Sequence, residues 1–263
     1  MRYSIKKITL LIILMKFSLS IYAQDSLSLQ PIAHKDSLIT RDDNLDYKKL
    51  IVPVSLISGG VIGFVIPEIK KYDVSLRNEV GDHRLNNSKL DNYTQFIPAA
   101  LVYGLNIAGV QGKHNFKDRT IILATSQAVS SAIVIPGKLL IGRERPDQSN
   151  NMSFPSGHAA IAFSTAQFMF REYKDSNYWI GLAGYPFAIF TSVYRIINNK
   201  HWATDVLAGA GIGILSTELA YWLYPKLKTL FKSKSVKTLS MISPYFQQSY
   251  QQKNFGVNYQ LFF

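Results

Sequence analysis

The chain has 263 residues, of which 47% are hydrophobic and only 17% are charged. This composition excludes an intrinsically disordered chain, and the lack of cysteine excludes disulfides, thiolate metal sites and cysteine nucleophiles. The formal net charge of +12 suits an anionic membrane, nucleic acid or a phosphate-handling site. No nucleic-acid-binding motif accompanies it, so we expect no nucleic-acid partner.

The first residues have the pattern of a secretory signal peptide. A basic start precedes a short apolar run, which Lys16 interrupts and the small residue Ala23 ends. This pattern predicts a signal peptide over residues 1–23, with an uncleaved anchor helix as the alternative. Residues 24–50 are polar and mixed in charge, and we expect them to form an exposed leader.

Six apolar segments follow, and their lengths and lack of two-residue alternation suit helices better than strands. The segments are 51–67, 96–110, 120–136, 157–170, 178–193 and 206–224. They predict an all-α fold, an up-and-down bundle of about six core helices over residues 51–225. Their length and near absence of charge favour a membrane-embedded bundle, with buried helices of a soluble protein as the alternative.

Two polar regions flank these segments. Residues 70–95 carry both signs of charge and are expected to form an amphipathic helix on a surface. The basic and aromatic tail, residues 226–263, ends in a partly alternating stretch. This tail is compatible with a small β-hairpin that turns around Gln251–Asn254, or with an unstructured end.

Three polar clusters interrupt the apolar half of the chain. The first runs from Lys138 to Pro146, the second over 155–158, and the third from Arg195 to Asp205. Lysine and arginine bind phosphate oxygens, and Pro146 disfavours helical geometry at Arg145. If the helices alternate in direction, all three clusters lie at the same end of the bundle. Within them, we expect Arg143, Glu144 and Asp147 to be loop charges.

The second and third clusters contain groups suited to proton transfer and nucleophilic attack. Ser156 is a good helix N-cap, and Gly157 lets the backbone approach an anion at the helix start. His158 lies in the first turn and can exchange a proton. His201 and Asp205 are four residues apart, so the carboxylate can hold one imidazole nitrogen while the other attacks.

Together, the clusters resemble the three-part signature of the type 2 phosphatidic acid phosphatase superfamily, which includes bacterial class A acid phosphatases and vanadium haloperoxidases. The resemblance is close over residues 138–205 and looser over the flanking helices. The matching residues are Lys138 with Arg145-Pro146, then Pro155-Ser156-Gly157-His158, then Arg195, His201 and Asp205. One departure is Tyr194, which stands where the family usually has serine, and it affects the expected shape of the pocket.

The resemblance implies a metal-independent phosphatase without a cofactor, acting on a phosphate monoester or diphosphate of a lipid. It implies that His201 forms a phosphohistidine, that Asp205 holds His201, and that His158 serves as acid and base. The phosphate would be bound by Lys138, Arg145, Ser156, Gly157 and Arg195. The remaining histidines, His34, His83 and His114, lie outside the signature and are expected to be exposed.

Other functions stay open beside this one. They are a soluble-type periplasmic acid phosphatase for small esters, a vanadate-dependent haloperoxidase, and a non-enzymatic membrane protein that binds anionic lipid. The signal-like start and the basic tail favour a bacterial cell-envelope protein whose site faces the periplasm. A cleaved signal starts the mature chain outside the cytoplasmic membrane, and six spans after it would place the site on the cytoplasmic side. Either residues 1–23 are not a signal peptide, therefore, or an early segment, 96–110 before 51–67, does not span; a largely periplasmic, membrane-associated helical protein is the third possibility.

Overall fold

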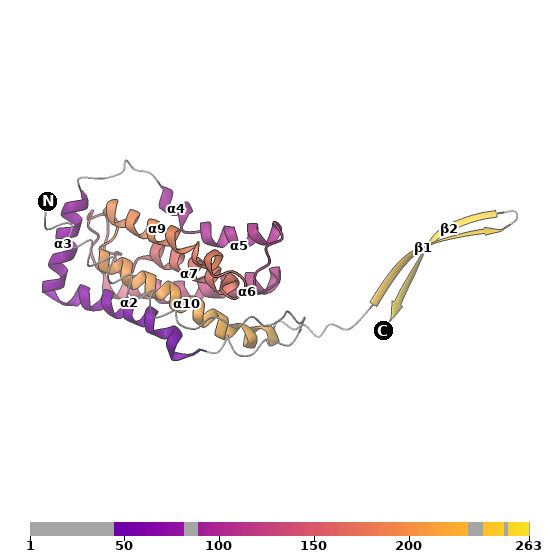
Figure 1. Ribbon diagram of the computed structural model, residues 1–263, viewed down its shortest axis with the longest axis horizontal. Helices are drawn as coiled ribbons and strands as arrows, with labels where there is room; N and C mark the ends of the chain where they lie inside the picture. Colours follow the sequence, from indigo (N-terminus) through magenta and orange to yellow (C-terminus); the bar gives the residue numbers. More distant parts are fainter. Residues whose placement is uncertain (1–44, 82–88, 231–238, 250–251, 263) are drawn as a thin grey trace. The chain divides into compact units, whose positions relative to one another are not determined.

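The computed structural model describes residues 45–81, 89–230, 239–249 and 252–262. The predicted signal peptide and most of the predicted leader lie outside the described residues. The helices, shown in Figure 1, are α2 (Tyr47–Val65), α3 (Pro67–Gly81), α4 (Leu90–Thr94), α5 (Ile97–Ile107), α6 (Phe116–Ile141), α7 (Gly157–Tyr173), α8 (Tyr178–Leu182), α9 (Tyr185–Ile197) and α10 (Ala203–Leu230).

Each of the six predicted apolar segments lies in a helix, with one division. The fifth segment separates into α8 and α9, because Gly184 precedes α9 and a proline occupies its first turn, where no backbone N–H is needed. Residues 70–95, expected to form one surface helix, contribute to α3 and α4 on either side of residues 82–88. Helix α6 ends at Ile141, within the first polar cluster, because Gly142 follows in the left-handed conformation.

Helix α10 lies at the centre of the bundle and packs against α2, α6 and α7. Glycines allow the closest approaches, because a Cβ at Gly209 would lie 2.4 Å from the carbonyl oxygen of Ser156. A Cβ at Gly213 would lie 2.2 Å from the carbonyl oxygen of Ala160. The start of α7 is therefore held against the start of α10, which brings the second and third polar clusters together.

We expect Gly213→Ala to destabilise the bundle by about 1–3 kcal/mol, because the added methyl group forces α7 and α10 apart. Gly104→Ala is the matched control, since a Cβ at Gly104 meets no atom within 4 Å. The control should be neutral or slightly stabilising, because it removes a glycine from a helix. Melting temperatures of the purified proteins in detergent test this, and equal values for both variants would contradict it.

Among the described residues, four helical stretches are long and apolar enough to cross a membrane: Tyr47–Val65, Phe116–Ile141, Tyr178–Ile197 and Ala203–Thr229. The segment named above as the weakest span, 96–110, forms the shorter helix α5. The next weakest, 51–67, lies in α2, which is a full-length candidate. Few residues of α2 are buried, and Ile51 and Val65 are among its exposed apolar side chains. Such exposure is unfavourable in water and favourable in lipid.

Two strands lie in the predicted tail, described here by itself. β1 (Leu239–Ser249) and β2 (Gln252–Phe262) pair antiparallel. The register places Leu239 opposite Phe262 and Ser249 opposite Gln252. The strands therefore reach into the stretch that the sequence analysis assigned to the turn.

Candidate active site

Four helix ends meet at one end of the bundle and bring the three polar clusters together. They are the C-terminal ends of α6 and α9 and the N-terminal ends of α7 and α10. Figure 1 shows α3 lying across the same end, where α10 begins. Two loops, 142–156 and 198–202, connect these helices and carry or adjoin the functional side chains.

The two loops are joined by hydrogen bonds. The Asp147 N–H donates to the carbonyl of Asn199 at 3.1 Å, and the Lys200 ammonium donates to the Asp147 carboxylate at 2.6 Å. The Trp202 indole N–H donates to the carbonyl of Glu144 at 2.9 Å. Asp147 is therefore a loop charge, as expected, and it keeps Arg145 close to the segment that carries His201.

Ser156 caps α7 and fixes its start. Its buried hydroxyl accepts from the Ala159 N–H at 3.4 Å, and its own N–H donates to the Asp205 carbonyl at 3.0 Å. The first turn of α7 thus adjoins the first turn of α10. Gly157 and His158 follow directly, with backbone N–H groups that are free of helical partners at this position.

His201 is almost completely buried beside Asp205. Its Nδ1 lies 3.6 Å from Asp205 Oδ2, which is an ion-pair distance and longer than a direct hydrogen bond. The carboxylate itself is held by Arg143 at 2.6 Å, by the Ser153 hydroxyl at 2.5 Å and by the Trp202 N–H at 3.0 Å. Since Nδ1 faces the carboxylate, Nε2 is the nitrogen left for chemistry.

His158 contacts α4, a helix that sequence reasoning did not connect with the site. Its Nε2 lies 2.8 Å from Asn92 Oδ1 and 3.7 Å from Asp91 Oδ2. Asp91 is buried and also pairs with Arg195 at 2.5 Å. α4 therefore orients one imidazole and one guanidinium of the predicted phosphate site.

The electrostatics of the two histidines connect them to the same cations. Burial, chiefly, lowers the pKa of His158 to about 4; Arg195 lowers it further, Asp91 opposes, and Arg145 and Lys138 add smaller effects. Burial also lowers the pKa of His201 to about 4, with Asp205 opposing and with Arg195 and Lys138 lowering it. Both imidazoles are thus neutral at pH 7, and one group of positive charges acts on both.

The three predicted phosphate-binding cations keep hydrogen-bonding capacity at the site. The Nε atoms of Arg145 and Arg195 are buried and have no hydrogen-bond partner in the described part of the chain. Lys138 is half-buried and donates to the carbonyl of Met152 at 2.7 Å. Buried guanidinium donors without protein acceptors suit an oxyanion that supplies the acceptor oxygens.

One expectation about this region is wrong. Arg143, expected to be a loop charge, is buried and pairs with Asp205 at 2.6 Å and Asp73 at 3.0 Å. Sequence reasoning also missed Ser153, Asp91 and the role of α3.

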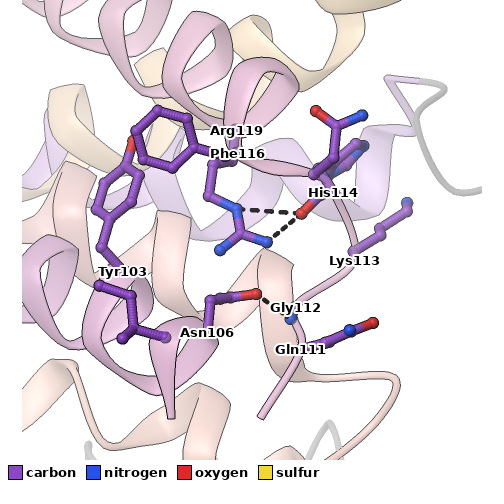
Figure 2. Close-up of a pocket in the computed structure, with 10 residues that line it drawn as sticks. Tyr103, Asn106, Gln111, Gly112, Lys113, His114, Phe116 and Arg119 are labelled. Carbon is purple, nitrogen blue, oxygen red and sulfur yellow. Dashed lines mark hydrogen bonds between the residues drawn. The ribbon is translucent and has the colours of Figure 1, made fainter. Parts of the chain in front are cut away.

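One cavity lies at the other end of α6, which is about 39 Å long at 1.5 Å per residue. It encloses about 470 Å³ and is lined by residues of α5, the 108–115 connection and the start of α6. Figure 2 shows Arg119 donating twice to the carbonyl of His114. His114 was expected to be exposed, but it is half-buried and pairs with Glu172 at 2.7 Å. His34 and His83 lie outside the described residues.

The family profile described as the PAP2 superfamily matches residues 119–229. Over these residues, which run from α6 into α10, the chain matches the PAP2 superfamily. All eight predicted site residues lie inside the matched stretch, whereas α3 and α4, with Asp73, Asp91 and Asn92, precede it.

Two curated proteins resemble parts of this chain. Lipid A 1-phosphatase of Porphyromonas gingivalis is 39% identical over 138 residues, which are 52% of this chain and 31% of that protein. Bacitracin transport permease protein BcrC of Bacillus licheniformis is 35% identical over 85 residues, which are 32% of this chain and 39% of that protein. The chain thus spans about a third of the length of the curated relatives it matches.

Two solved structures resemble it more distantly. LpxE of Aquifex aeolicus has a TM-score of 0.43 and 21% identity, covering 56% of this chain and 93% of that one. The transmembrane PAP2 type phosphatidylglycerolphosphate phosphatase from Bacillus subtilis has a TM-score of 0.48 and 20% identity, covering 70% and 98% respectively.

Proposed function

We propose that this PAP2 protein is a membrane-embedded phosphatase that hydrolyses a lipid phosphate through a phosphohistidine on His201. The observation that carries the proposal is the convergence of two neutral imidazoles on one group of cations, one imidazole beside a fixed carboxylate. Such a site can stabilise the charge of a phosphoryl group in transfer and supply both a nucleophile and a proton donor.

The first step is transfer of the phosphoryl group to His201. The lone pair of Nε2 attacks phosphorus, the bond from phosphorus to the lipid oxygen breaks, and His158 gives its proton to that oxygen. His158 is neutral without substrate, and the negative charge of a bound phosphate offsets the cations and favours its protonation. Lys138, Arg145 and Arg195 hold the non-bridging oxygens, with Ser156 and the Gly157 amide assisting.

The second step releases inorganic phosphate. His158, now neutral, takes a proton from a water molecule while the water oxygen attacks phosphorus. The bond from phosphorus to His201 Nε2 breaks, which restores the neutral imidazole. The three cations supply the positive charge throughout, so we propose that no metal ion takes part.

A lipid is the favoured substrate for two reasons. Four stretches of the bundle are suited to a membrane, and one relative of the chain is named as a lipid A 1-phosphatase. The test is phosphate release in detergent from a panel of lipid phosphates and from a water-soluble aryl phosphate. Faster turnover of the aryl phosphate would favour the soluble-type acid phosphatase, and binding without release would favour the non-enzymatic alternative.

The proposed site faces the outside of the cytoplasmic membrane. Lys117, Lys226 and Lys228 lie at the opposite end of the bundle, and basic residues favour the cytoplasmic side. α2 runs antiparallel to α10, since Gly63 adjoins Thr204 and Pro53 adjoins Gly211. If both helices cross, Asp46 lies on the cytoplasmic side.

Single cysteines test this sidedness, because the chain has none of its own. We expect Asn151→Cys, in the exposed loop after α6, to react with a membrane-impermeant maleimide in intact spheroplasts. We expect Asp46→Cys and Asp175→Cys to react only after permeabilisation. Labelling in the reverse pattern would place the site in the cytoplasm.

The low pKa of His201 predicts activity at acid pH. A neutral nucleophile is required, so the acid limb of kcat/KM should lie near pH 4, where His201 takes up a proton. A histidine of ordinary pKa would lose activity near pH 6.5. Comparing two substrates whose phosphate groups differ in pKa distinguishes titration of the enzyme from titration of the substrate. A limb near pH 6.5 that is the same for both would contradict the prediction.

A further inference from the structure

Arg143 is a buried guanidinium that faces carboxylates and not the proposed phosphate site. Its Nη1 donates to Asp205 Oδ1 at 2.6 Å and to the Thr204 hydroxyl at 2.7 Å. Its Nη2 donates to Asp73 Oδ2 at 3.0 Å. One planar guanidinium thus bridges the start of α10 and the middle of α3, an arrangement that a lysine ammonium cannot reproduce.

The partners of Arg143 are themselves fixed. Asp73 is buried and accepts from both the N–H and the hydroxyl of Thr204, so α3 holds the residue next to Asp205. The guanidinium also lies 4.8 Å from the ring centre of Phe64 and 5.2 Å from that of Trp202. Aromatic faces on such a cation limit its movement.

α3 also holds the loop on which Arg143 lies. The Arg77 guanidinium donates to the carbonyl of Pro146 at 2.9 Å, one residue after Arg145. α3 therefore contacts both the segment that carries a phosphate-binding arginine and, through Asp73 and Arg143, the catalytic carboxylate. It lies at the surface, as expected, and Asp73 and Arg77 also join it to the site by polar contacts.

We infer that Arg143, clamped to Asp73 on α3, is a positioning residue that sets the orientation of Asp205 and through it of His201. This inference rests on the proposed function. Asp205 lies 3.6 Å from the imidazole, so a small rotation of the carboxylate decides whether the hydrogen bond to Nδ1 forms when substrate binds. A nucleophile displaced by about 1 Å loses on the order of 10²-fold in rate.

The inference predicts a division between turnover and phosphate binding. The cations proposed to hold the phosphate are Lys138, Arg145 and Arg195, whereas the side-chain hydrogen bonds of Arg143 among the described residues go to Asp205, Thr204 and Asp73. Weakening Arg143 should therefore slow formation of the phosphohistidine while leaving the affinity for an oxyanion in place.

The experiment compares Arg143→Lys and Asp73→Asn with the control Glu144→Gln, whose side chain is exposed on the same loop. We expect Arg143→Lys to lower kcat by about 10²-fold, with inhibition by inorganic phosphate close to that of the wild type. Asp73→Asn keeps the contact of Arg143 with Asp205 and should lower kcat by about tenfold. Glu144→Gln should match the wild type. If Arg143→Lys fails to fold, Asp73→Asn provides the same comparison.

Two outcomes would overturn the inference. One is a wild-type kcat in both variants, and the other is an equal loss of kcat and of inhibition by phosphate, which would make Arg143 a phosphate-binding group. The proposed function is separate: it fails if the wild type releases no phosphate or if His201→Ala stays active. The positioning role alone would be rejected if the wild type is active, His201→Ala is inactive and Arg143→Lys is fully active.

Discussion

His201→Ala is expected to lower phosphate release by at least about 10⁴-fold, the largest effect in this molecule, because it removes the attacking atom. The cations and His158 stay in place, so the variant should still bind inorganic phosphate. In the wild type, a radiolabelled substrate quenched with base should leave label on the protein, since a phosphorus–nitrogen bond is stable to base and labile to acid. The variant should carry none.

His114→Ala is the matched control for this experiment. His114 also pairs with a buried carboxylate, that of Glu172 at 2.7 Å, but at the opposite end of the bundle. A loss of packing or charge balance alone would affect both variants similarly. Activity in His201→Ala close to that in His114→Ala would reject the phosphohistidine mechanism.

His158→Ala is expected to lower turnover of a lipid phosphate by about 10²–10⁴-fold, the usual contribution of a general acid or base. The step that is slowed in His158→Ala should depend on the leaving group. An aryl oxide leaves without a proton, so His201 should still be phosphorylated by an aryl phosphate. Water activation is also lost, and the labelled phosphoenzyme should therefore accumulate in His158→Ala.

The amount of radiolabelled phosphate on the protein distinguishes the roles of His201 and His158. We expect a burst of aryl alcohol followed by slow turnover in His158→Ala, and no burst in His201→Ala. If His158→Ala shows wild-type turnover of the lipid phosphate, another group supplies the proton. Asn92 and Asp91, which contact His158, would then hold a structural residue and not a catalytic one.

The helical segments and the ordered polar clusters could be predicted because they depend on local sequence. Uncharged runs of helical length identify the helices, and the four-residue spacing of His201 and Asp205 places both at the start of one helix. Helix α6 ends before Arg145 is reached, because Gly142 adopts the left-handed conformation that ends a helix.

The contributions of α3 and α4 could not be predicted in this way. Asp91 pairs with Arg195 across 104 positions, and Asp73 accepts from Thr204 across 131. No periodicity or spacing connects residues so far apart, and a mixed-charge stretch is equally typical of a solvated surface. Arg143 pairs with carboxylates, whereas Arg145 lies at the candidate phosphate site. This difference could not be predicted either, because the residues around each arginine come from helices that are distant in the sequence.

The amino-acid sequence alone predicted which side chains form the candidate phosphate site and in what order they occur, because residue type and short-range spacing specify donors, imidazoles and helix starts. Only the tertiary structure decided which of the charged groups lie at the candidate site without a carboxylate partner and which hold other side chains in place. Packing of α3, α4 and α10 around one end of the bundle makes that choice, because a buried charge is stable only where the fold supplies its partner.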